Sequence, residues 1–138
     1  MVVPKKGKPE ITLQSEVLSI EKASEILGTV SYSRAFFFYQ EIGKPLGKAA
    51  ISLSDFCNKI NTIPPKSLVF HLERRDFENW IKDVIGDVEL ARRISNIRAK
   101  KAQTIKKKLN QCVSDRITEL KETWAVSLAT SETIPVPQ

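Results

Sequence analysis

The sequence predicts a mainly α-helical fold, with about five or six helices packed as a single small domain and a candidate short β-hairpin near residues 35–51. Two observations support this class. Apolar residues recur at three- and four-residue spacing, which is typical of helices that bury one face. Prolines, glycines and helix-capping residues stand where these apolar stripes begin and end. We expect a flexible N-terminal tail over residues 1–10, the helical domain over residues 11–127 and a flexible C-terminal tail over residues 128–138.

The stretch Ser67–Ile97 has the densest helix punctuation in the chain. It follows Pro65, and proline is tolerated only outside a helix or in its first turn. Asp76 is a candidate N-cap, because its carboxylate can accept from the free N–H groups of a first turn. Gly86 suits the left-handed residue after a helix end, and Asp87 suits the cap of the next helix. The apolar stripes between these marks consist of Phe77, Trp80, Ile81, Val84 and Ile85, followed by Leu90, Ile94 and Ile97. We therefore expect three short helices joined by tight turns.

Two serines further upstream are candidate helix caps. Ser19 precedes residues 20–27, whose helix would end at the following glycine. Ser52 precedes a helix that would end near Asn61, and Asp55 makes an imperfect capping box with it.

The segment between these two helices predicts the hairpin. Residues 36–39 are all aromatic, which favours a strand on a pleated surface. Residues 43–47 contain two glycines and predict a turn, and residues 49–51 would return as the second strand.

The C-terminal part contains no Gly or Pro between Asp87 and Pro135, so one continuous helix is conceivable. Its apolar residues nevertheless form two stripes that are displaced by about 100° around a helix. The second stripe consists of Ile105, Leu109, Cys112, Val113, Ile117, Leu120 and Trp124. We expect a break between Asn96 and Lys101, followed by the longest helix, which spans roughly residues 100–126.

The central stretch also carries a motif. Residues 70–91 read F-H-x-x-R-x-D-F-x-x-W-I-x-x-V-x-G-D-x-x-L-A, and residues 43–56 read G-x-x-x-G-x-x-A-x-S-L-x-x-F. These residues resemble a family of small archaeal and bacterial domains of unknown function, over roughly residues 35–120. The resemblance implies a helical domain of prokaryotic, archaeal origin. The family has no known activity, so the resemblance implies no catalytic or binding residue.

The residue inventory argues against an enzyme. His71 is the only imidazole, and no nucleophile or phosphate-binding loop accompanies it. An acid–base cluster of His71 with the nearby Glu73, Arg75 and Asp76 is the less favoured alternative to a histidine that packs between helices and satisfies a backbone carbonyl. Trp80 lies in an apolar stripe and is expected in the core. Cys57 and Cys112 lack metal-ligand spacing and are expected to be small buried thiols. We therefore expect no catalytic residue, metal site or cofactor, and no small-molecule substrate is indicated.

No targeting or membrane segment is evident. The N-terminal residues lack the apolar core of a secretory signal. The longest aromatic–aliphatic run, residues 35–39, is far too short to span a bilayer. We expect a cytoplasmic protein with no membrane span.

The charge distribution provides the one functional hypothesis. Residues 91–114 contain no acidic residue and carry a charge of +8, against +6 for the whole chain. The candidate nucleic-acid-binding residues are Arg92, Arg93, Arg98, Lys100, Lys101, Lys106, Lys107 and Lys108. Lysines at the start of a helix oppose the helix dipole, so helix stability does not explain them. A binding partner explains them, and a lysine-rich solvated face is the equally weighted alternative.

Two functions of different classes follow. The first is a non-enzymatic protein that binds DNA or RNA phosphates through residues 92–108. The second is a protein-interaction or assembly module, in which the charged C-terminal helix pairs with a partner, including a weak homodimer. Attachment of a basic amphipathic helix to an anionic membrane ranks third, because the apolar face of that helix is expected to lie in the core.

Overall fold

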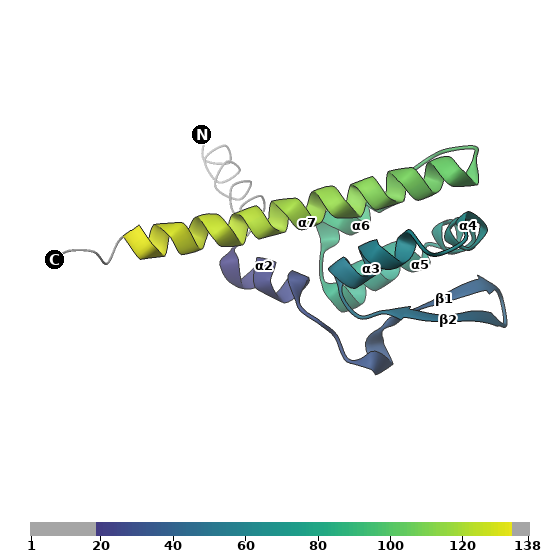
Figure 1. Ribbon diagram of the computed structural model, residues 1–138, viewed down its shortest axis with the longest axis horizontal. Helices are drawn as coiled ribbons and strands as arrows, with labels where there is room; N and C mark the ends of the chain where they lie inside the picture. Colours follow the sequence, from purple (N-terminus) through teal and green to yellow (C-terminus); the bar gives the residue numbers. More distant parts are fainter. Residues whose placement is uncertain (1–18, 134–138) are drawn as a thin grey trace, which may run out of the picture.

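Two strands and six α-helices follow one another along the computed structural model, which describes residues 19–133, and the side chains among them up to Ala125 (Figure 1). The prediction of a small, mainly helical domain with a β-hairpin is confirmed. The elements are α2 (Ile20–Leu27), η1 (Tyr32–Arg34), β1 (Phe36–Glu41), β2 (Lys44–Ala50), α3 (Leu53–Ile60), α4 (Pro65–Glu73), α5 (Asp76–Trp80), the π-helical turn η2 (Ile81–Ile85), α6 (Val88–Ser95) and α7 (Ala102–Thr133).

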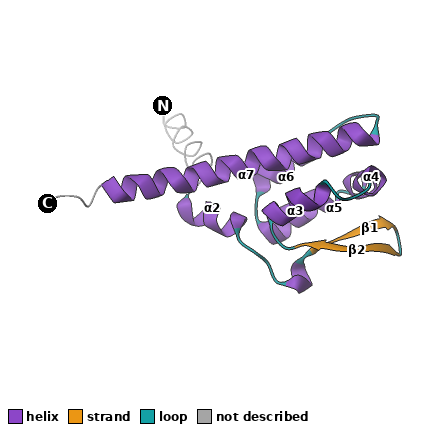
Figure 2. Ribbon diagram, in the orientation of Figure 1, coloured by secondary structure: helices purple, strands orange, loops and turns teal. Residues whose placement is uncertain are grey.

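Helix α7 runs along the length of the molecule, and the shorter elements lie on one side of it (Figure 2). Helices α2, α3, α4 and α6 all contact α7. The hairpin packs on α3 and α4 rather than on α7, because β1 contacts α4 and β2 contacts α3. The order of layers is therefore α7, then the short helices, then the hairpin.

The core is aromatic where the hairpin meets the short helices. Phe36 and Phe38 of β1 are buried, and their neighbours include Phe56 of α3 and Phe77 of α5. Trp80 is 7% exposed and donates its indole N–H to the Arg34 carbonyl at 2.8 Å. The prediction that Trp80 belongs to the core is confirmed.

Most of the predicted caps are correct. The Ser19 and Ser52 hydroxyls accept from the backbone N–H groups of Lys22 and Asp55, both at 3.0 Å. Gly86 has a φ of 89°, in the left-handed region, and Asp87 caps α6 by accepting from Leu90 N–H at 3.1 Å.

The prediction that Asp76 is an N-cap is wrong. Helix α5 begins at Asp76 itself, and the cap position is Arg75, which has a φ of 65°. The Asp76 carboxylate is turned to His71 and Arg74 instead of the first turn. The contacts with His71 and Arg74 have therefore replaced the local capping bond.

The hairpin is present, but its predicted turn is misplaced. The tight turn is at residues 42–43, and β2 already begins at Lys44. Gly47 lies inside β2 with a φ of 75°, where the pairing passes from Phe38↔Lys48 to Tyr39↔Pro45. A glycine in this conformation marks a bulge, which sequence reasoning mistook for the end of the turn.

The expected break before the long helix is confirmed, since α6 ends at Ser95 and α7 begins at Ala102. Helix α7 continues to Thr133, past the expected end at residue 126 and into the segment expected as a C-terminal tail. The rest of that segment, and the tail predicted over residues 1–10, lie outside the described residues. No helix within residues 19–133 is long and apolar enough to cross a membrane.

Candidate functional site

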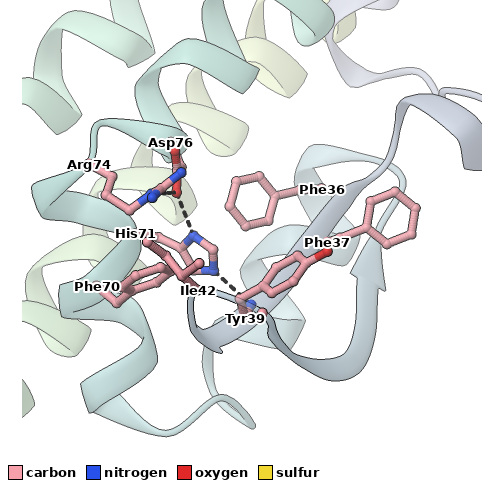
Figure 3. Close-up of a pocket in the computed structure, with 9 residues that line it drawn as sticks. Phe36, Phe37, Tyr39, Ile42, Phe70, His71, Arg74 and Asp76 are labelled. Carbon is pink, nitrogen blue, oxygen red and sulfur yellow. Dashed lines mark hydrogen bonds and ion pairs between the residues drawn. The ribbon is translucent and has the colours of Figure 1, made fainter.

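A pocket of about 480 Å³ opens between β1, the hairpin turn and the C-terminal end of α4 (Figure 3). This volume lies in the range of small-ligand sites. Its walls are mainly aromatic, and its polar end holds one arginine and one aspartate. The lining residues are Phe36, Phe37, Tyr39, Ile42, Gly43, Phe70, His71, Arg74 and Asp76.

His71 ties α4 to the outer edge of β1. The residue is 3% exposed, and its Nε2 accepts from the Tyr39 backbone N–H at 2.8 Å. The Tyr39 carbonyl in turn accepts from the Ser67 hydroxyl at 2.6 Å. Two side chains of one helix thus take the place of a third strand beside Tyr39.

The second ring nitrogen of His71 is also used inside the protein. Nδ1 lies 2.9 Å from Oδ2 of Asp76 (Figure 3). The neutral tautomer that is protonated at Nδ1 satisfies both contacts, because Nε2 must then accept. Burial lowers the pKa of His71, which favours this neutral form. His71 is buried as predicted, but it binds a backbone N–H and a carboxylate rather than a carbonyl.

Arg74 and Asp76 form the polar end of the pocket. Nε of Arg74 donates to Oδ2 of Asp76 at 3.0 Å, the same oxygen that faces His71. The guanidinium carbon lies 5.1 Å from the centre of the Phe70 ring, a cation–π arrangement that holds the side chain over the pocket. Sequence reasoning gave Arg74 no role and placed Phe70 in a short buried turn or helix. The signal was present, because both belong to the motif over residues 70–91.

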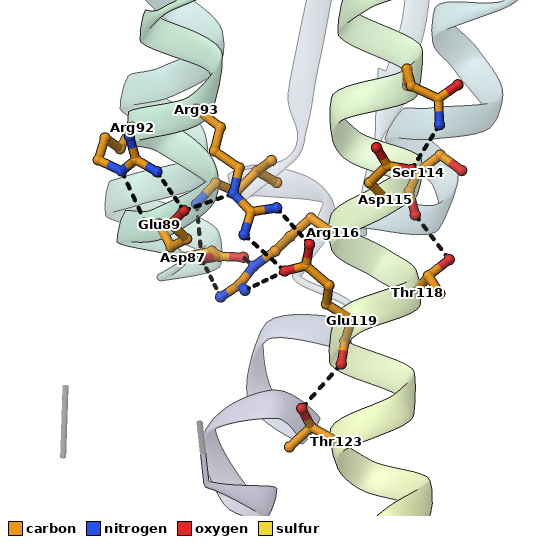
Figure 4. A network of polar contacts seen from close by, with 12 residues as sticks. Asp87, Glu89, Arg92, Arg93, Ser114, Asp115, Arg116, Thr118, Glu119 and Thr123 are labelled. Carbon is orange, nitrogen blue, oxygen red and sulfur yellow. Dashed lines mark hydrogen bonds and ion pairs between the residues drawn. The ribbon is translucent and has the colours of Figure 1, made fainter. Parts of the chain in front are cut away.

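The eight basic residues predicted as a nucleic-acid site fall into two groups. Arg92 and Arg93 belong to a network between α6 and α7 (Figure 4). Arg92 binds Glu89 at 2.7 Å, and Arg93 binds both Glu89 at 2.7 Å and Glu119 at 2.8 Å. Hydrogen bonds from these two guanidinium groups lower the pKa of Glu89 to about 2. The charges of Arg92 and Arg93 are thus compensated within the protein.

The other group, which we call the basic end, comprises six residues with no carboxylate within 4.0 Å among the residues that the structure describes. They occupy the loop before α7 and its first two turns. The basic end consists of Arg98, Lys100, Lys101, Lys106, Lys107 and Lys108.

Members of the basic end differ in how they are held. The ammonium group of Lys106 donates to the Asn61 carbonyl at 3.1 Å, and that of Lys108 donates to the Arg98 carbonyl at 2.7 Å. Lys100, Lys101 and Lys107 are exposed and make no hydrogen bond with their side chains to any described residue. These last three are the cations most accessible to a partner.

The α6–α7 network also contains a buried pair that sequence reasoning missed. Nε of Arg116 donates to Oδ2 of Asp87 at 2.8 Å, and the two side chains are only 10% and 1% exposed. Burial opposes the charge of Arg116, but the hydrogen bonds to Asp87 raise its pKa overall. The sequence does indicate that Arg116 is buried. It follows a four-three-four spacing along one face of α7 with three apolar residues, Leu109, Val113 and Leu120.

No group of three or more His, Cys, Asp or Glu side chains suited to a metal ion occurs within residues 19–133. Cys57 and Cys112 are free and half-buried, and burial raises the pKa of both thiols. The thiols are therefore less exposed to reaction than ordinary surface cysteines.

Comparisons of the chain with protein-family models, with curated proteins and with solved structures found no match.

Proposed function

We propose that the protein is a non-enzymatic nucleic-acid-binding protein whose basic end contacts phosphates. The observation that carries this proposal is the lack of carboxylate partners for the basic end among the described residues, whereas Arg92 and Arg93 nearby are paired with Glu89 and Glu119. Arg98, Lys106 and Lys108 donate to backbone carbonyls, whereas Lys100, Lys101 and Lys107 make no side-chain hydrogen bond to a described residue and are available to an anionic partner. Phosphate backbones neutralise such clusters by releasing their counterions.

The position of the basic end supports an anionic partner. The first turn of α7 contains no acidic residue. A helix N-terminus already carries a partial positive charge, so lysines placed there raise the local potential and oppose helix stability by a few tenths of a kcal/mol each. The same arrangement attracts a polyanion, because the helix dipole and the lysines act in the same direction.

The test is a titration of labelled duplex DNA and duplex RNA at several salt concentrations. If about four to six side chains contact phosphates, log K should fall with log salt at a slope of about −4 to −5 on DNA. Replacement of Lys100, Lys101 and Lys107 by glutamine should flatten this slope by about two to three units. Sequence preference should not change, since phosphate contacts do not read bases.

The matched control is a variant that loses a lysine from the same helix, away from the basic end. Lys121→Gln removes an exposed cation about 20 Å further along α7 and should leave the slope almost unchanged. Absence of measurable binding at low salt, or an equal effect of Lys121→Gln per charge removed, would overturn the proposal.

A second candidate function is assembly through α7. Trp124 is 45% exposed near the far end of this helix, which is unusual for a large aromatic side chain. It could supply apolar contact area to a protein partner. Membrane attachment through α7 receives less support, because Leu109, Val113 and Leu120 are fully buried in the core.

A further inference from the structure

The polar end of the aromatic pocket has hydrogen-bonding capacity that the protein does not use. Arg74 donates through Nε to Asp76, and neither of its Nη groups donates to any described residue. Asp76 accepts through Oδ2 from both His71 and Arg74, and its Oδ1 accepts from no residue in the described part of the chain. The pocket therefore presents donors and an acceptor side by side.

The charges at this polar end compensate one another. Arg74 and Asp76 form an ion pair, and the His71 ring is neutral in the tautomer that its contacts require. A ligand with a full charge gains little here, because one member of the pair would repel it. A neutral group with a donor next to an acceptor fits both Arg74 and Asp76.

The walls of the pocket suit a flat ring. Phe37 is 39% exposed and meets the Tyr32 ring edge-on, with ring centres 5.2 Å apart. Tyr39 is half-buried beside it, and Phe70 faces them from α4 (Figure 3). Exposed aromatic faces stack with planar ligands, and such stacking is the main base contact in proteins that bind single strands.

We propose that this pocket binds an unpaired nucleobase, with the ring stacked on the aromatic walls and its edge read by Arg74 and Asp76. An Nη group of Arg74 donates to a ring carbonyl or ring nitrogen, and Oδ1 of Asp76 accepts from the adjacent N–H of the base. The inference rests on the proposed function, since a strand held by the basic end would present its bases to the pocket. Recognition of an unpaired base by stacking and edge hydrogen bonds is the usual way in which proteins read single strands.

The turn between α4 and α5 borders both the pocket and the loop before α7. A second depression, of about 330 Å³, is lined on one side by Leu72, Glu73, Arg75 and Glu78 and on the other by Arg98 and Ala99. The turn that carries Arg74 therefore borders the loop where the basic end begins.

The first experiment uses ligands that carry no phosphate. The four ribonucleosides, with ribose as the control, are titrated at concentrations on the order of millimolar while backbone amide resonances are recorded by NMR. At least one nucleoside should shift the amides of Phe37, Tyr39 and His71, and ribose should not. Failure of all four nucleosides to shift these amides would overturn the inference and leave the proposed function intact.

The second experiment tests the reading of the base edge. Arg74→Met keeps an unbranched apolar side chain about as long as the arginine stem but removes the donors, and should weaken nucleoside binding by about tenfold. Arg75→Met is the matched control, because it removes the same charge from the next residue, which does not line the pocket. Equal weakening by the two variants, with unchanged thermal melting of both, would overturn the assignment.

The third experiment separates the pocket from the basic end. A single-stranded RNA oligonucleotide and an abasic strand of the same length are compared with the wild type and with the Arg74→Met variant. The wild type should bind the RNA several-fold more tightly than the abasic strand, and Arg74→Met should abolish that difference while its salt slope is kept. Equal binding of both strands by the wild type would refute the proposal that the pocket binds a base and would leave the proposal of phosphate binding intact. If the protein bound nucleosides but neither strand, the proposal that the basic end binds phosphates would be refuted instead.

Discussion

The two ring nitrogens of His71 face groups that require opposite hydrogen-bonding roles, a donor at one nitrogen and an acceptor at the other. Asp76 requires a proton on Nδ1, and the Tyr39 N–H requires a bare lone pair on Nε2. Protonation of the ring at low pH would place a donor against the Tyr39 donor and break the contact between α4 and β1. The neutral ring is therefore part of the fold.

This arrangement predicts how stability depends on pH. Burial lowers the pKa of His71 below its unfolded value of about 6.5, so the unfolded chain binds more protons between these two values. The free energy of unfolding should be highest above pH 6.5 and fall as the pH drops through the folded pKa. Urea denaturation at pH values from about 7.5 to 5 measures this.

The chain itself provides a clean control for that experiment. It contains a single histidine, so His71→Gln removes the only side chain whose ordinary pKa lies in this window. The variant should be less stable, and its stability should be nearly independent of pH there. The assigned tautomer would be contradicted if the free energy of unfolding of the wild type did not change with pH, or if that of the variant changed with the same slope.

At the scale of elements, α6 and α7 are joined by a chain of ion pairs that becomes more buried toward Asp87. Arg92 and Glu89 lie at its exposed end, and Arg116 and Asp87 at its buried end (Figure 4). Asp87 also caps α6, so one carboxylate fixes both the start of α6 and its position on α7. Removal of an arginine should therefore lower the free energy of unfolding far more at the buried end than at the exposed end.

Removal of Arg116 should be far more damaging than removal of Arg92. Arg116→Leu leaves the Asp87 carboxylate buried without its partner, which costs about 3–5 kcal/mol for such pairs. Arg92→Leu removes a solvent-exposed partner of Glu89 and should change the free energy of unfolding little. Chemical denaturation measures the free energy of unfolding of both variants. An equal decrease in the two would show that the buried pair contributes no more to stability than the exposed pair.

Local sequence signals predicted the elements well and the site poorly. Caps at Ser19, Ser52 and Asp87, and the break before α7, are decided by residues within a few positions, so the sequence contains the information. Asp76 has the same local signature as these caps. Its carboxylate binds His71 instead, and that choice depends on how α4 meets β1.

The pocket and the division of the basic segment depend on tertiary structure in the same way. The pocket requires the hairpin beside α4, and the bulge at Gly47 that shapes the hairpin was read as a turn. Arg93 resembles its basic neighbours in sequence, but the packing of α6 on α7 places it against Glu119. The sequence does indicate Arg116, through its place in an apolar stripe, and it indicates Arg74 and Phe70 through the motif over residues 70–91.

At the scale of the molecule, charge is separated along α7. The basic end lies at its start, and Asp115 and Glu122 are exposed further along. Glu119, which sequence reasoning placed with them, is held by Arg93 and Arg116 and is compensated within the chain. An antiparallel pair of α7 helices would still bring each basic end near Asp115 and Glu122 of the other copy.

The assembly hypothesis therefore predicts a weak, salt-sensitive antiparallel dimer, in which these charges set the orientation and Trp124 supplies apolar contact. Exposed ion pairs contribute only about 0–1 kcal/mol each, so the affinity should be low. Sedimentation equilibrium at low and high salt should show association that decreases with salt and is lost in a double variant, Asp115→Lys with Glu122→Lys. These two positions avoid Glu119, whose replacement would break the α6–α7 network. Glu21→Lys with Asp83→Lys changes the charge equally on other elements and should associate like the wild type. A wild type that stays monomeric at high concentration and low salt rules out this dimer.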